Sequence, residues 1–172
     1  YVQLEGKQLV EAKLAIVDVE LQNLGLLYPQ IYEYDFSGMV NGRLTFSNRS
    51  EELVYQGQLK VGKFQTVFGQ FGDMDLNVRY EDKAFDILSL KLSNLHHLNL
   101  SGTFISDHDF DIDIFGGSFI RMEAFDFFSK RKMVGKMGIK GRLSRSDVGF
   151  GFDGAIDSKA LTFNDSVLDY VY

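Results

Sequence analysis

Apolar and polar residues alternate along most of the chain, and this period of two constrains the fold more than any other feature. Between residues 34 and 47 the even positions hold Tyr, Phe, Gly, Val, Gly, Leu and Phe, whereas the odd positions hold Asp, Ser, Met, Asn, Arg, Thr and Ser. The alternation returns at residues 53–61, 74–80, 98–104, 110–114 and 148–156. A strand places every second side chain on one face, whereas a helix would spread such a pattern around its circumference. The sequence therefore predicts an all-β, mostly antiparallel chain.

Two architectures would give each strand one apolar and one polar face. Two sheets could pack their apolar faces together across about 10 Å, or a single sheet could curl around an apolar interior. Glycines recur within the strands on the apolar face, at Gly38, Gly42, Gly57, Gly102 and Gly154. A glycine inside a strand usually marks a bend, a bulge or a close approach of another backbone. The glycines favour the curled sheet, although alternation alone fits both architectures.

Two short apolar segments interrupt the alternation and predict one or two turns of helix each. They are Asn23–Tyr28 and Glu123–Phe128. Short helical plugs of this kind can cover the open end or edge of a sheet, where backbone groups would otherwise stay unpaired.

The amino-acid sequences that follow the two predicted plugs are similar to each other, which indicates an internal repeat. Gly38–Leu44 resembles Gly138–Leu143, with Gly42 and Gly141 placed 99 positions apart. A period near one hundred residues implies a unit of several strands whose neighbours complete its core. We expect residues 1–172 to be a single fragment of a longer repeating protein, with approximate units at 18–118 and, in part, 119–172.

Composition and charge exclude several classes of function. The chain has 18 Lys and Arg against 24 Asp and Glu, a net charge of −6, which argues against nucleic acid as a partner because phosphates need a surplus of cations. With no cysteine there is no disulfide, thiol nucleophile or cysteine zinc site. No run approaches the ~18–20 apolar residues that a membrane-spanning helix needs. The chain begins at Tyr1 without a signal sequence, and we expect it to be cut from something larger.

Several patterns imitate functional motifs. Gly149–Gly154 satisfies G-x-G-x-x-G, but alternation continues on both sides, so we expect strand and not a phosphate-binding loop. The aspartates of Asp107–Asp113 lack the glycine of a calcium loop and are expected on a solvated strand face, with weak surface Ca²⁺ binding as the alternative. Gly116–Ile120 begins like a nucleophile elbow but lacks its final glycine.

The three histidines and a run of basic residues are further candidates for a binding site. Adjacent strand residues point to opposite faces, so His96 and His97 cannot easily share a metal, and we expect them in a solvent-exposed turn. His108 is the third histidine. Seven of the 18 basic residues fall within 16 positions and predict a solvated face or, alternatively, a headgroup or partner contact; they are Lys130, Arg131, Lys132, Lys136, Lys140, Arg142 and Arg145. The sequence therefore predicts no catalytic residue, no metal ligand, no cofactor and no enzymatic activity.

The order of several soft motifs resembles the TamB/AsmA-like bacterial envelope proteins. The matching segments are Asp18–Pro29, Phe36–Ser47, Tyr55–Val61, Asp73–Tyr80 and Leu98–Phe104. They are similar to that family's "DLxLL.P" start, its "LSGxLxGxLxLSG" strand, and the "P.L.G.L.L", "L.DLDL.V.Y" and "L.LSG.L" elements that follow, although this chain lacks the Pro of the third motif and has Asn48 where the second motif ends in Gly. The resemblance covers roughly residues 14–105 and returns at 119–172.

The resemblance implies an open U-shaped groove of curled sheet, a β-taco, in the periplasm and cell envelope of a diderm bacterium. It implies anchoring to the inner membrane by a segment outside this fragment, and continuation of the groove into flanking segments of the same chain. The expected function is to shield phospholipid acyl chains between the inner and outer membranes and to support protein assembly in outer-membrane biogenesis. A TamA-like outer-membrane barrel is the implied partner.

An acyl chain would be held without polar chemistry, because each buried methylene contributes about 0.8 kcal/mol. The residues expected to line the groove are Phe36, Val40, Leu44, Phe46, Leu59, Val61, Met74, Leu76, Val78, Tyr80, Leu98, Leu100, Phe104, Phe110, Ile112 and Ile114. The first alternative is that they fill the core of a closed sandwich or solenoid that serves as a structural or adhesive envelope module. The second is a β-helical carbohydrate enzyme, for which only Asp107–Asp113 supplies clustered carboxylates.

Overall fold

The computed structural model describes residues 2–5, 8–26, 34–49, 52–106, 109–163 and 166–171. The strands are β1 (Val2–Glu5), β2 (Gln8–Glu20), β3 (Ser37–Arg49), β4 (Glu52–Thr66), β5 (Gly69–Glu81), β6 (Ala84–Ser93), β7 (Leu98–Ser106), β8 (Asp109–Ile114), β9 (Phe119–Arg121), β10 (Met133–Ser146), β11 (Gly149–Phe163) and β12 (Ser166–Val171). The helical segments are the 3₁₀ turns η1 (Leu21–Leu26) and η2 (Met122–Ala124) and the short α2 (Asp126–Ser129).

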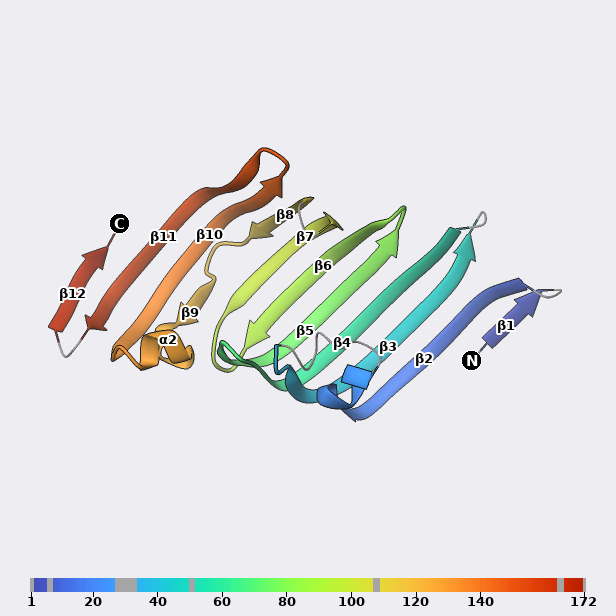
Figure 1. The fold of residues 1–172 in the computed structure, drawn as a ribbon, viewed down its shortest axis with the longest axis horizontal. Helices are drawn as coiled ribbons and strands as arrows, with labels where there is room; N and C mark the ends of the chain where they lie inside the picture. The colour runs from blue at the N-terminus through green and yellow to red at the C-terminus, as the bar shows by residue number, and fades with distance from the viewer. Residues whose placement is uncertain are drawn as a thin grey trace.

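All of these strands belong to one open antiparallel sheet (Figure 1). Its order follows the sequence from β1 to β8 and then continues through β10, β11 and β12. β8 and β9 both pair with β10, β8 along residues 141–145 and β9 along residues 136–138, so the two act as one interrupted strand. The two termini lie at opposite ends of the sheet (Figure 1). The prediction of an all-β antiparallel chain is confirmed, and within the described ranges the strands form a single sheet and not a closed sandwich.

Strand pairing aligns the apolar side chains into rows, because directly opposed residues share a face. Four such rows cross the strands. The first row consists of Val19, Val40, Val61, Met74, Leu92 and Leu98, and the second of Ile16, Leu59, Leu76, Leu90, Leu100 and Ile114. The third row consists of Leu14, Leu44, Val78, Ile87, Ile112, Leu143 and Phe152, and the fourth of Phe46, Tyr55, Tyr80, Phe85, Phe104, Phe110 and Phe150. Glycines such as Gly42 and Gly102 occupy intervening positions of the same rows. One face of the sheet is therefore largely apolar across nine neighbouring strands, β2 to β8, β10 and β11, with Arg145 as a charged member of the fourth row.

Bulges held by side chains from neighbouring strands interrupt the ladder. Asp18 and Lys63 have left-handed backbone, with φ of 50° and 55°, and each lies at a register shift. The Asp18 N–H donates to Asn41 Oδ1 at 2.9 Å, and the Lys63 N–H donates to Asp73 Oδ1 at 2.9 Å. A bulge bends and twists its strand, so these polar contacts help to set the shape of the sheet.

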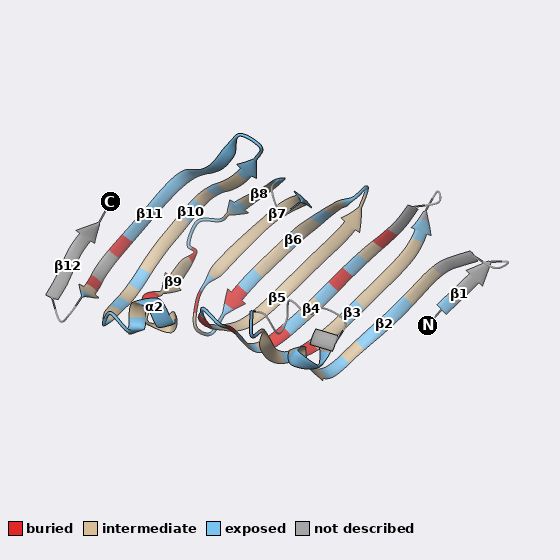
Figure 2. Ribbon diagram, in the orientation of Figure 1, coloured by how far each residue is buried: buried red, intermediate tan, exposed pale blue. Residues whose placement is uncertain are grey.

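Burial on the apolar face falls from one end of the strands to the other (Figure 2). In the first row, Val40, Val61 and Leu92 are only 2%, 3% and 5% exposed, whereas Phe85 and Phe150 in the fourth row are 40% and 67% exposed. The helical segments lie at the end that carries the first row (Figure 1). The apolar face is therefore covered at one end and open at the other.

Both segments that were predicted as helical plugs are helical over their described parts. The first begins earlier than expected, as η1 at Leu21, and residues 27 and 28 lie outside the described residues. The second divides into η2 and α2. The order helical segment, strand, antiparallel strand recurs as η1–β3–β4 and η2/α2–β10–β11, which is the order that the proposed repeat requires; the repeat boundaries stay a prediction.

Candidate functional site

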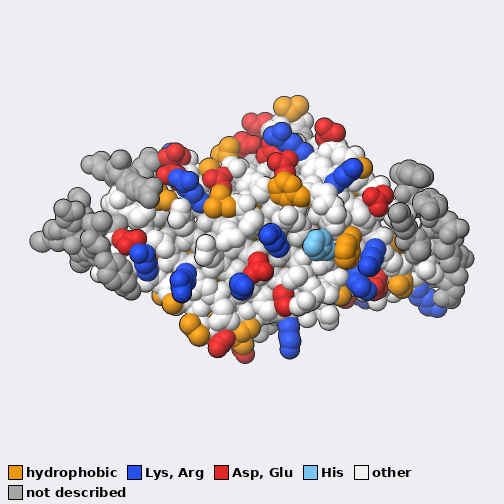
Figure 3. Space-filling view, turned by 180° about the vertical axis from the view of Figure 1, so that it is seen from behind, with side chains coloured by type: hydrophobic (Ala, Val, Ile, Leu, Met, Phe, Trp, Pro, Cys, Tyr) orange, Lys and Arg blue, Asp and Glu red, His pale blue; other side chains and the backbone are white. Residues whose placement is uncertain are grey.

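The face opposite the four rows is polar. One of its rows contains Asn41, Lys60, Asp75, Lys91 and Asn99, each on a different strand. Seen from behind Figure 1, this side carries scattered Lys, Arg, Asp and Glu side chains (Figure 3). Such a sheet exposes charges to water on one side and hydrocarbon on the other, so its apolar face is the candidate functional site.

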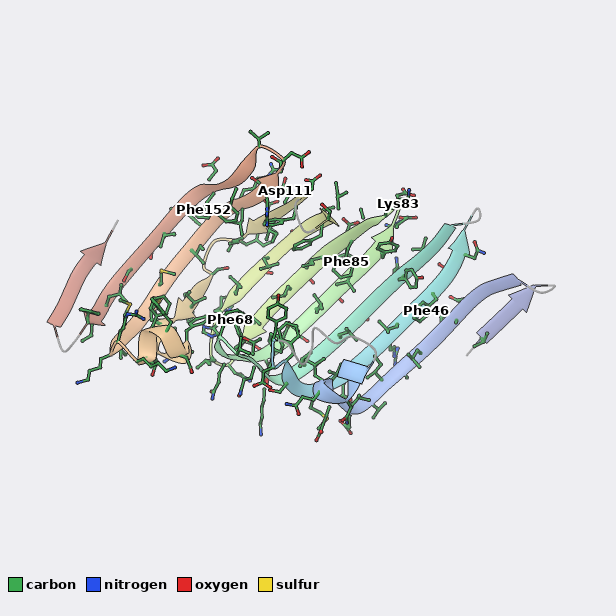
Figure 4. All side chains as sticks on the ribbon, in the orientation of Figure 1. Phe46, Phe68, Lys83, Phe85, Asp111 and Phe152 are labelled. Carbon is green, nitrogen blue, oxygen red and sulfur yellow. The ribbon has the colours of Figure 1, made fainter. Side chains whose placement is uncertain are left out.

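Fifteen of the 16 residues expected to line a groove lie in the four rows, so the structure places them on one face. Figure 4 labels Phe46, Phe85 and Phe152, which come from β3, β6 and β11 and mark the breadth of this face. Phe85, Phe152, Leu90 and Leu143 belong to the rows but were not in the predicted set. Phe152 and Leu143 were within reach of the sequence, because alternation marks both strands.

Phe36 is the exception, because it lies before β3 and joins an aromatic cluster at the covered end. The cluster consists of Phe36, Phe64, Phe71, His96 and Phe125. Its ring centroids are 5.8 Å apart for Phe36 and Phe64, 5.6 Å for Phe64 and Phe71, and 5.5 Å for Phe71 and Phe125. These offset and edge-on contacts suit aromatic rings. The cluster connects η2 and α2 to the end of the sheet and covers the first row.

His96 is buried in this cluster, so the expectation that it lies in solvent was wrong. The residue is 2% exposed, and its ring lies 5.3 Å from that of Phe125. Its Nδ1 accepts a hydrogen bond from the Arg121 N–H at 3.0 Å, so Nε2 carries the proton that it shares with the Gln70 carbonyl oxygen at 2.9 Å. The two histidines do point to opposite sides: His97 is exposed and stacks on Phe119. His108 lies outside the described residues.

Two of the hollows on the molecule belong to the polar face. The larger, of about 600 Å³, is lined mostly by hydrophilic side chains, namely Asn41, Arg43, Gln58, Lys60, Asp75, Asn77, Ser89 and Lys91, with backbone from the intervening positions. The other, of about 510 Å³, lies beside β9 and β10 and includes Lys136 and Lys140. The lining of the larger hollow suits water and hydrated ligands, whereas the other hollow also includes Phe119 and Ile139 and is mostly apolar.

Asp111, in the middle of the aspartate series of residues 109–113, forms an ion pair with Arg142. Asp109, Asp111 and Asp113 project from β8 on the polar face, as predicted, and Asp107 lies outside the described residues. A hydrogen bond from the Arg142 guanidinium, together with its charge, holds the pKa of Asp111 below its usual range. A general acid needs a raised pKa, so this arrangement favours an ion pair over glycosidase chemistry.

The remaining motif-like patterns are structural. Gly149–Gly154 lies within the continuous strand β11, as predicted. Ser118 is buried between β8 and β9, where its hydroxyl accepts from the Asn99 N–H at 3.1 Å. Among the residues that the structure describes, no group of three His, Asp or Glu side chains could hold a metal ion.

The seven clustered basic residues are all exposed, as predicted, but they point in different directions. Lys136, Lys140 and Arg142 lie on the polar face of β10, whereas Arg145 shares the fourth row with Phe110 and Phe150. Lys130, Arg131 and Lys132 follow α2 at the covered end of the sheet. The seven residues therefore form three separate features, and the last of them lies beside the exposed ring of Phe127.

Glu123 ties η2 to β10, and its pKa predicts how acid affects the fold. Partial burial raises the pKa of Glu123. Hydrogen bonds from the N–H groups of Glu123 and Gly135, together with the Arg121 guanidinium, lower it by more than burial raises it, so the pKa lies below its ordinary value. A carboxyl with a lowered folded-state pKa stabilises the fold above its unfolded pKa, and this contribution is lost as the pH falls through the folded value.

We therefore expect Glu123→Gln to show a smaller loss of stability than wild type between about pH 5 and pH 3. Urea unfolding at each pH measures this. Glu20→Gln removes an exposed carboxyl from β2 and corrects for the change in net charge. Parallel pH profiles for wild type and Glu123→Gln would contradict the assignment.

Comparison with known proteins gives no assignment: no family model, no curated protein and no solved structure matches the chain. In the described part of the chain, the helices are all too short and too polar to span a bilayer.

Proposed function

We propose that this chain is a lipid-conduit segment of a TamB/AsmA-like envelope protein, whose apolar sheet face shields phospholipid acyl chains from water. The observation that carries the proposal is the set of four apolar rows, which begin on β2 or β3, extend to β7 or β8 and in two cases reach β11, opposite a charged face. Isolated surface hydrophobic residues need no explanation, but a contiguous apolar surface of this extent marks a binding site.

The dimensions suit a hydrocarbon chain. Nine neighbouring strands at about 4.8 Å spacing give a width of roughly 43 Å, and seven residues along a strand span about 23 Å. About ten methylenes shielded by this surface would contribute roughly 8 kcal/mol before the entropic cost of binding. The rows contain no charged side chain between β2 and β8, so a chain sliding across them meets similar surface at each strand.

The positions at which the sheet can bend also support a lipid groove. We infer that the open sheet is one section of a curled, U-shaped groove, with the apolar rows inside and the aromatic cluster at one margin. The bulges at Asp18 and Lys63 and the apolar-face glycines supply the bends that such a curl requires. The groove would continue into flanking segments of the same chain, in the periplasm, with a TamA-like barrel as the outer-membrane partner.

The test is lipid occupancy. The fragment purified from bacterial membranes in mild detergent should carry phospholipid in native mass spectrometry, with lipid extraction in parallel. Leu76→Asp/Leu100→Asp places two charges in the second row and should abolish both the bound lipid and the uptake of a fluorescent fatty acid. Asn77→Asp/Asn99→Asp adds the same charge at neighbouring positions on the opposite face of β5 and β7, and should retain lipid.

Circular dichroism checks that each variant folds. If the leucine variant unfolds, Phe85→Ser/Phe152→Ser tests the same face at half-exposed positions. An apo mass for wild type without fatty-acid uptake would overturn the conduit, as would equal lipid binding by the two Asp variants. A lipid-free dimer would instead support the structural-module alternative, with two apolar faces packed as a sandwich.

A further inference from the structure

A basic and aromatic tip projects from the covered end of the sheet. We define the tip as Val67, Phe68, Phe127, Lys130, Arg131 and Lys132. The first two form the turn between β4 and β5, Phe127 belongs to α2, and the three cations follow it. Val67, Phe68 and Phe127 are 47%, 60% and 58% exposed, so hydrocarbon faces water here as well as on the sheet face.

The two parts of the tip are held together through the backbone. The Asp126 N–H donates to the Phe68 carbonyl oxygen at 3.3 Å, and Gly69 forms a β-bridge with Phe125. Gly69 has φ of 146°, and a Cβ there would lie 2.2 Å from the Ala124 carbonyl oxygen, so only glycine allows this approach. Figure 4 labels Phe68 at the end of the sheet where α2 lies. The exposed rings therefore belong to a fixed surface whose arrangement does not depend on a ligand.

The charge of the tip is opposite to that of the whole chain. Lys130, Arg131 and Lys132 give three positive charges, and Asp126, which pairs with Lys130 at 3.6 Å, gives one negative charge, a net of +2. The chain as a whole carries −6. The Arg131 guanidinium lies 3.7 Å from the Phe127 ring centroid, which keeps a cation directly beside the exposed ring.

We propose that this tip docks on the surface of an anionic phospholipid bilayer. Aromatic rings are favoured at the level of the headgroups, and Phe68 and Phe127 would enter that layer. The adjacent cations would contact lipid phosphates, where each contributes roughly a fivefold increase in affinity. Because the rest of the chain is acidic, an anionic surface would attract this end and repel the others, which orients the sheet relative to the membrane.

Vesicle flotation tests the proposal with vesicles of phosphatidylcholine alone and of phosphatidylcholine with 30% phosphatidylglycerol, on the order of physiological anionic content. Wild type should float with the anionic vesicles and release at high salt, since surface charges are screened. Lys130→Gln/Arg131→Gln/Lys132→Gln should weaken binding about 100-fold, and Phe68→Ser/Phe127→Ser should weaken it at least about tenfold. Ile105→Ser/Val148→Ser removes two exposed hydrophobic residues that lie outside the four rows at the opposite end of the sheet, and this variant should bind as wild type does.

The tip is independent of acyl-chain binding on the sheet face. Leu76→Asp/Leu100→Asp should lose the fluorescent fatty acid and still float, so the two proposals fail separately. No flotation by wild type would overturn the docking proposal. Equal binding to neutral and anionic vesicles, or an equal loss in the Ile105/Val148 variant, would overturn it too, because binding would then follow general hydrophobicity.

Discussion

Replacing His96 with alanine should lower the free energy of unfolding by about 3 kcal/mol. The substitution leaves a cavity beside Phe71 and Phe125, and it leaves the Arg121 N–H and the Gln70 carbonyl oxygen without the imidazole as their hydrogen-bond partner. Because those partners come from β9 and β5, the loss should loosen the helical segments from the end of the sheet. Urea unfolding monitored by circular dichroism measures the change.

The neighbouring histidine provides the control for this experiment. His97→Ala removes an exposed ring that stacks on Phe119, and surface substitutions of this kind usually change stability by about 0.5 kcal/mol or less. His96→Phe keeps the ring volume while removing both hydrogen bonds, so it should fall between wild type and His96→Ala. Equal stability of the His96→Ala and His97→Ala variants would refute the structural role of His96.

The second large effect is expected at Gly42. A Cβ there would lie 2.2 Å from the Gln58 carbonyl oxygen and 2.8 Å from a methyl group of Leu59. Both neighbours belong to β4, the strand paired with β3, so relief requires the two strands to move apart. We expect Gly42→Ala to destabilise the fold by about 3 kcal/mol, the upper end of overpacking costs.

Gly116 makes the matched comparison, because a Cβ at that position would meet nothing within 4 Å. Alanine in place of an unstrained glycine reduces the entropy of the unfolded chain and usually stabilises by about 0.4–1 kcal/mol. The two glycine variants should therefore shift the thermal midpoint in opposite directions. If Gly42→Ala raises the midpoint as well, the close strand approach at Gly42 is wrong.

Alternation predicted strands where it was uninterrupted and missed them where a bulge changed its phase. β6 has two adjacent apolar residues, Ile87 and Leu88, at a register shift, and Leu88 is 55% exposed. β2 changes phase in the same way at Asp18. A bulge adds one residue to a strand. After it, the apolar residues change from even to odd positions of the sequence, or the reverse, although the strand itself continues.

The residues of the candidate site likewise fall into those that alternation could place and those that it could not. Alternation correctly predicted that fifteen of these residues share one face of the sheet, because the side chains of a strand have a fixed period. Phe36 and His96 could not be placed this way, since both lie beside a strand end and contact rings far away in the sequence. Phe36 packs on Phe64, and the buried His96 packs on Phe125. Nothing in the local pattern of either residue records those contacts.

By itself, the sequence determined an antiparallel β chain with one apolar and one polar face, because the alternation of side chains is a local property of strands. Only the tertiary structure decided how the strands are paired, which end of the apolar face is covered, and that Phe68 and Phe127 lie on one tip. These features depend on contacts between distant segments, such as that of Gly69 with Phe125, whose energies arise only after the chain has closed the loops between them.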